Sequence, residues 1–95
     1  MTVPEQRQVA ETAKELWNLM LPDVNSPELY TFLLWATFGS EILSRAINRT
    51  AAKYRRMQST PTPMNAEDCA RYCSSVCRNI VTRRQLSQQC RRVQF

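Results

Sequence analysis

Histidine is absent from this 95-residue sequence, and glycine occurs only once, at position 39. Without histidine, the chain cannot form Ser-His-Asp or Cys-His catalytic groups, and it lacks the side chain that most often binds metals. One glycine is too few for the glycine-rich loops that bind phosphate in Walker-type and dinucleotide-binding proteins. We therefore expect a protein that is not an enzyme and that requires no cofactor.

Long hydrophobic runs are also missing. The longest apolar stretch, residues 32–38, includes Thr37 and is much shorter than the roughly 20 residues of a membrane-spanning helix. The first residues, MTVPE, lack the basic and apolar segments that begin a secretory signal peptide. Strand-like alternation bounded by hairpin turns does not occur either. We expect an all-α protein that neither spans a membrane nor is secreted by that route.

The cysteines are poorly spaced for a disulfide framework or a metal centre. Cys69, Cys73 and Cys77 lie four residues apart in one predicted helix, and Cys90 follows later. On a helix these three side chains share one face over about 12 Å, so they do not converge on one ion or pair with good disulfide geometry. The Cys-x3-Cys spacing resembles that of twin-motif proteins of the mitochondrial intermembrane space, but a second, separate pair is missing. We expect reduced thiols packed in the core, no metal, and a cytoplasmic protein.

Apolar spacing predicts a first helix over residues 4–20, with Pro4 in the first turn, where a missing backbone N–H costs nothing. A second helix is predicted over residues 27–38, with Ser26 as its N-cap and Pro27 in its first turn. Because nearly every side chain of the second helix is apolar, we expect the other helices to surround it. The predicted buried stripe of the first helix consists of Val9, Ala13, Leu16, Trp17 and Met20.

Two further helices are predicted in the second half of the chain. Gly39 stands where a helix end favours a residue that tolerates positive φ, and a third helix follows over residues 41–57. A polar linker with two prolines then disfavours helix. The fourth helix is predicted over residues 66–84, because Asn65 and Asp68 have the spacing of a capping box.

Residues 85–95 show no clear helical period, and we expect them to form a basic, flexible tail. The length of the chain and its 43% hydrophobic residues fit a single domain with a modest core. The predicted fold is therefore a compact four-helix domain over residues 1–84, followed by that tail.

Charge is divided unequally along the sequence. Residues 1–41 contain two basic and six acidic side chains, which gives −4, whereas residues 42–95 contain eleven basic and two acidic ones, which gives +9; the sum is the net charge of +5. Such a division indicates a basic surface directed at an anionic partner. Arginine outnumbers lysine 11 to 2, and its planar guanidinium suits bidentate contacts with phosphate.

The basic residues of the third predicted helix fall largely on one arc, because four of them are spaced by three or four positions. We predict that this arc binds nucleic acid, DNA or RNA, mainly through phosphates and without catalysis. Further arginines of the fourth helix extend the predicted site. The residues that we predict to bind nucleic acid are Arg45, Arg49, Lys53, Arg55, Arg56, Arg71, Arg78, Arg83 and Arg84.

Other interpretations of the same residues remain open. The basic arc is also compatible with a merely solvated face, with binding to a membrane surface, or with a protein-interaction module. In the last case the acidic helix 4–20 of one copy meets the basic helix 41–57 of another, as in a homodimer, or an acidic protein surface takes that place. The helices on either side of Gly39 resemble a helix-turn-helix, but Trp35 and Arg45 stand where that motif has a small and an apolar residue.

Overall fold

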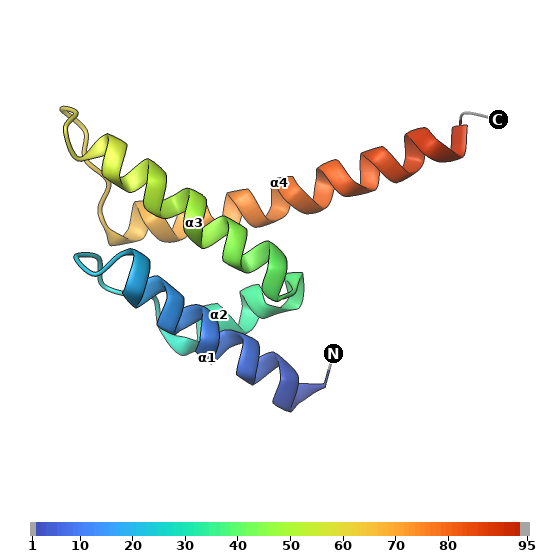
Figure 1. Cartoon of the computed structure of the whole chain (residues 1–95), viewed down its shortest axis with the longest axis horizontal. Helices are drawn as coiled ribbons and strands as arrows, with labels where there is room; N and C mark the ends of the chain where they lie inside the picture. The colour runs from blue at the N-terminus through green and yellow to red at the C-terminus, as the bar shows by residue number, and fades with distance from the viewer. Residues whose placement is uncertain (1, 94–95) are drawn as a thin grey trace.

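The computed structural model describes the backbone of residues 2–93 and the side chains as far as residue 87. Within that part of the chain all regular structure is helical, so the prediction of an all-α, four-helix fold is confirmed (Figure 1). A single turn of 3-10 helix, η1, continues α2. The elements are α1 (Val3–Met20), α2 (Leu29–Trp35), η1 (Ala36–Phe38), α3 (Ser40–Met57) and α4 (Ala66–Val93).

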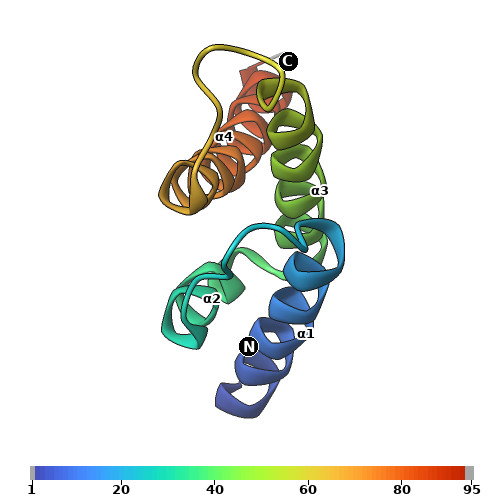
Figure 2. The same ribbon diagram turned by 90° about the vertical axis from the view of Figure 1, so that its left-hand side faces the viewer.

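The helices form two layers. Figure 2 shows α1 and α3 in one layer and α2 and α4 in the other, and the extents of 49 × 36 × 16 Å agree with a slab two helices thick. The main contacts are those of α1 with α2, of α1 with α3, and of α3 with α4. The edge formed by α3 and α4 therefore lies opposite the edge formed by α1 and α2.

An aromatic cluster joins the first two helices. Trp17 of α1 is fully buried, with its ring centroid 6.0 Å from that of Phe32 and 6.3 Å from that of Trp35. Phe32 and Trp35 contact each other edge to face at 5.4 Å. The Nε1–H of Trp17 has no hydrogen-bond partner among the described residues. This cluster fixes α2 against α1, because aromatic rings bury large areas in specific geometries.

The contact between α3 and α4 is built from small side chains and thiols. Ala46, Thr50, Cys69, Cys73 and Cys77 are all fully buried there, and the Thr50 hydroxyl donates to the Ala46 carbonyl at 2.7 Å. The three cysteines are free thiols in the core, as the sequence predicts, and Cys90 lies outside the residues with described side chains.

Burial and hydrogen bonding shift the acidity of these thiols. Burial, with a smaller effect of Asp68, raises the pKa of Cys69. A hydrogen bond to Cys77, followed by burial, raises the pKa of Cys73, and the same hydrogen bond lowers the pKa of Cys77. Cys69 and Cys73 therefore remain protonated at neutral pH and act as small apolar groups.

The predicted helix boundaries at Gly39 and Asn65 are confirmed. Gly39 has φ 94°, in the region that L side chains avoid, and α3 begins directly after it. At the start of α4, the Asp68 N–H donates to Asn65 Oδ1 at 2.8 Å, and the Asn65 N–H donates to Asp68 Oδ2 at 3.2 Å. These reciprocal bonds form the capping box that the sequence predicts.

The second helix differs from its prediction. It begins at Leu29, because the chain remains extended at Glu28 and the Ser26 and Pro27 start signals are not used. It is also not surrounded: Tyr30 is 67% and Leu34 is 53% exposed. The nearly uniform apolar composition of α2 does not indicate which side of the helix faces the core. In the structure other helices cover only one side of α2, so its other side is exposed.

The fourth helix is longer than predicted. Its backbone is helical as far as Val93 rather than ending near residue 84. Residues 94 and 95 lie outside the described part, and flexibility of residues 85–95 stays a prediction. Between residues 2 and 93, we find no helix with the length and apolar character of a membrane span.

Candidate nucleic-acid interface

The structure brings six of the nine predicted residues to one edge of the molecule. They come from α3 and α4, on the outer side of the seam where these two helices pack. We define the basic face as Arg45, Arg49, Lys53, Arg56, Arg83 and Arg84.

We call Arg45, Arg49, Lys53 and Arg56 the α3 arc, and Lys53 shows where this arc lies relative to α4. Its Nζ is 4.3 Å from the ring centroid of Tyr72, a residue of α4, in a cation–π contact. Arg49 and Arg56, on the same arc of α3, are exposed. The arc therefore borders the Tyr72 flank of α4 and faces solvent along the seam.

Glu41 joins the two helices at the other end of the seam. Its Oε1 is 3.2 Å from Nη2 of Arg45, one turn further along α3, and 3.3 Å from Nη2 of Arg84 on α4. All three side chains are about half exposed or more, so these pairs add little to stability. Their importance is spatial, because they place the first residues of the α3 arc beside Arg84.

Arg83 belongs to the same face through the geometry of α4. It follows Tyr72 by eleven positions, which is close to three full turns, so both lie on one flank of the helix. Among the described residues no carboxylate is within ion-pair distance of five predicted arginines, three of which belong to the basic face. These five are Arg49, Arg55, Arg56, Arg78 and Arg83.

Arg71 and Arg78 lie on a different flank of α4. Arg78 is six positions from Tyr72, about 120° around the helix. Both arginines line a shallow hollow of about 440 Å³ beside Trp35 of α2. Arg71 pairs with Glu67 at 2.6 Å, and Arg78 donates to Ser74 Oγ at 2.9 Å. The predicted site is thus divided between two surfaces.

Arg55 is the remaining predicted residue. It is exposed on α3, about 100° around the helix from Arg56 and on the side away from Lys53, the residue that contacts α4. The structure does not bring it into the basic face.

Glu41 and Tyr72 border the basic face but were not among the predicted site residues. Glu41 and Arg45 have the i, i+4 spacing of a helical ion pair, which sequence alone reveals. The contacts of Glu41 with Arg84 and of Lys53 with Tyr72 join different helices, and no sequence signal indicates them.

The opposite edge of the molecule is acidic. Glu5, Glu11 and Glu15 of α1 are exposed, and only Glu11 pairs with a base, Arg7, at 3.2 Å. Because α1 contacts α2 and α3 and does not form a main contact with α4, the two charges are separated in space as well as in sequence. Because α1 also contains Arg7 and Lys14, its net charge is −1, and the described part of the molecule is strongly basic at one edge and weakly acidic at the other.

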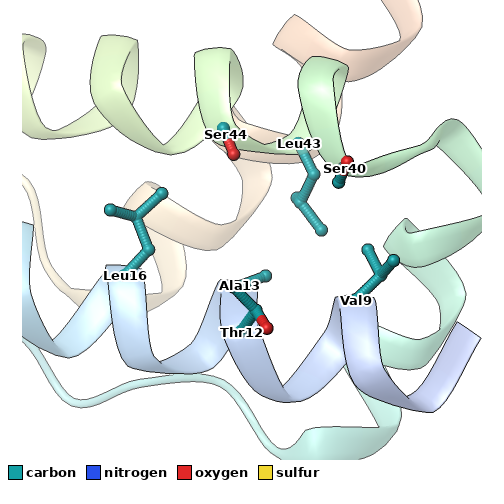
Figure 3. A pocket seen from close by; sticks show the side chains of 7 residues that line it. All are labelled: Val9, Thr12, Ala13, Leu16, Ser40, Leu43 and Ser44. Atoms are coloured by element: carbon teal, nitrogen blue, oxygen red, sulfur yellow. The ribbon is translucent and has the colours of Figure 1, made fainter. Parts of the chain in front are cut away.

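One partly enclosed cavity among the described residues is small. It lies between α1 and α3 and has a volume of about 30 Å³, with Val9, Leu16 and Leu43 pointing into it together with three hydroxyl residues (Figure 3). That is about the share of one water molecule in the liquid, and none of its lining residues is titratable. Among the side chains that are described, no group of three or more Cys, Asp or Glu is arranged to hold a metal ion.

Comparison with known proteins adds no relative: the chain matches no family model and has no significant similarity to a curated protein or to a solved structure. Function must therefore be argued from the surface itself. The main surface features are the basic face, the hollow beside Trp35 and the acidic edge of α1.

Proposed function

We propose that this chain is a small, non-catalytic module that binds nucleic acid through the basic face. The observation that supports the proposal is the set of exposed arginines that have no carboxylate partner among the described residues, above all Arg49, Arg56 and Arg83. A face that serves solubility alone normally mixes charges of both signs. Here Glu41 lies at one end of the seam, and the half-buried Asp68, which caps the start of α4, lies four positions before Tyr72 at the other end. The arginines between them are exposed.

The proposed mechanism is counterion release. Each phosphate that an arginine neutralises releases a condensed cation from the nucleic acid, which makes the affinity depend on salt. If the α3 arc neutralises about four phosphates, log K falls against log salt with a slope of about −3.6. Arginine suits this role because its guanidinium forms paired hydrogen bonds with phosphate oxygens.

The test is fluorescence anisotropy of labelled DNA and RNA with the double variant Arg49→Glu/Arg56→Glu. Both side chains are exposed, so the variant is expected to keep the helical circular dichroism spectrum and to lose at least tenfold in affinity. Arg7→Glu/Lys14→Glu on α1 makes the same change in net charge away from the basic face, and we expect it to bind within about twofold of the parent. Equal affinity of the two variants would overturn the proposal.

The uneven charge distribution supports a second candidate function, which is association between copies of the chain or with an acidic protein. In a self-associating arrangement, the acidic edge of α1 on one copy meets the basic face of the next. This function predicts a particle mass that falls with added salt and no affinity for DNA or RNA. Sedimentation at two salt concentrations distinguishes it from the first.

We also propose a reducing, cytoplasmic location. The support is the three buried, free cysteines of α4, since proteins of oxidising compartments tend to use their cysteines in disulfides. Titration of thiols in the denatured protein, isolated from cells under acid quench, tests this: oxidised Cys69, Cys73 or Cys77 would contradict it.

A further inference from the structure

The end of α4 extends beyond the rest of the molecule. Residues 82–93 continue the helix for about 18 Å at the usual rise per residue, and Figure 1 shows this part projecting past the end of α3. The side chains of residues 82–87 are all exposed, so none of them packs on the core. A helix segment whose side chains do not pack on the rest of the domain gains little stability from that domain.

The charge of this projecting segment identifies the kind of partner that it fits. Residues 82–93 contain four arginines and no acidic residue. Among the described side chains, Arg83 and Arg84 lie at its base, and Arg84 meets Arg45 of the α3 arc at Glu41. The projecting helix therefore continues the basic face rather than beginning a separate surface.

Aromatic side chains decide between single-stranded and double-stranded partners. Proteins that bind single strands commonly stack the bases on exposed aromatic rings. On the basic face the aromatic ring is that of Tyr72, and Lys53 covers it. Trp17, Phe32 and Trp35 are buried among one another, and the exposed Tyr30 belongs to α2 in the other half of the molecule. The face is built for phosphates rather than for unstacked bases.

Groove dimensions decide between the two kinds of duplex. An α-helix with its side chains is about 10–12 Å across, and the major groove of B-form DNA is about 12 Å wide. The major groove of A-form RNA is deep and too narrow for such an element. An exposed, basic helix end therefore fits the major groove of B-form DNA and not that of A-form RNA.

From these observations we infer that the ligand is double-stranded DNA, with the projecting end of α4 in the major groove and the α3 arc on the flanking phosphates. This inference rests on the proposed function. Arg83 is the described side chain of the segment best suited to reach a base edge, since arginine pairs with guanine in this groove.

The experiment compares binding of three probes of equal phosphate number: a DNA duplex, one of its strands, and an RNA duplex of the same sequence. We expect the DNA duplex to bind at least tenfold more tightly than either of the others. Dimethyl sulfate footprinting then reads the groove, because guanine N7 lies in the major groove. Protection of N7 by the parent protein is expected.

Two variants of α4 serve as a matched pair. Arg83→Glu is expected to weaken duplex binding about tenfold and to remove the N7 protection, whereas Arg78→Glu, with the same charge change on the other flank, is expected to do neither. Arg83→Gln, which introduces no negative charge, is expected to show the same loss of protection. Circular dichroism confirms that each variant is folded.

The outcomes separate the inference from the function on which it rests. Binding of the single strand or the RNA duplex as tightly as the DNA duplex, or binding without N7 protection, would overturn the inference and leave nucleic-acid binding in place. An absence of binding to all three probes would overturn both.

Discussion

The two parts of α4 have opposite environments although they belong to one continuous helix. In residues 66–81 a stripe of cysteine, valine and isoleucine is buried against α3, whereas the side chains of residues 82–87 are all exposed. The first part is helical because tertiary packing holds it, and the second part has only its backbone hydrogen bonds. Regular secondary structure is thus a poor guide to local stability, and the comparison between these two parts is open to direct measurement.

Hydrogen exchange should give the largest difference between the two parts. Amides near Cys73 and Cys77 are expected to exchange only through global unfolding, while amides of residues 84–93 open locally at almost no cost in free energy. We expect protection factors that differ by at least about a thousandfold, since core amides open with a free energy of roughly 5 kcal/mol or more. Similar protection along the whole helix, measured by NMR in the free protein, would contradict the comparison.

Truncation of one apolar side chain in each part tests the same contrast in energy. Ile80 is 7% exposed and Leu86 is 55% exposed. Ile80→Ala is expected to lower the free energy of unfolding by about 2–4 kcal/mol, because it removes buried methyl groups and leaves a cavity. Leu86→Ala is expected to change it by less than about 0.5 kcal/mol. Urea denaturation measures both, and a large loss in Leu86→Ala would show that the projecting part packs on something.

The smallest expected effect arises at Glu41 of α3, which pairs with Arg84 near the start of the projecting part of α4. Glu41→Gln removes the carboxylate that pairs with Arg45 and Arg84, so both guanidinium groups become available to phosphate. We expect DNA affinity to rise about two- to fivefold, with a steeper salt dependence. Glu67→Gln, which releases Arg71 on the other flank, is the control and should leave the affinity unchanged. A gain in both variants would mean that net charge alone sets the affinity.

Much of the fold was predictable because its signals are local. The capping box of Asn65 and Asp68 and the positive φ of Gly39 both depend on residues within a few positions of one another. The exposed side of α2 was not predictable, since an almost wholly apolar helix has no polar face to mark it. The extension of α4 was missed because polar sequence after Val81 weakens the hydrophobic period without ending the helix.

The candidate site shows the same division between local and long-range information. The α3 arc follows from helical spacing, and the structure places its four residues together as predicted. The sequence grouped Arg71 and Arg78 with that arc, but only the packing of α4 on α3 determines which flank of α4 is beside it. Whether these residues bind nucleic acid remains a prediction that the variants above test.

The position of the two tryptophans makes the protein its own fluorescent reporter. Trp17 and Trp35 stack in the aromatic cluster, and Trp17 is fully buried with an indole N–H that meets no partner among the described residues. Both rings belong to the half of the molecule away from the basic face, and Trp35 lines the hollow with Arg71 and Arg78. Intrinsic emission should therefore follow unfolding while staying unchanged by a ligand on the basic face. A ligand that entered the hollow would alter the emission of Trp35. A fluorescence titration without any label therefore distinguishes binding in the hollow from binding on the basic face.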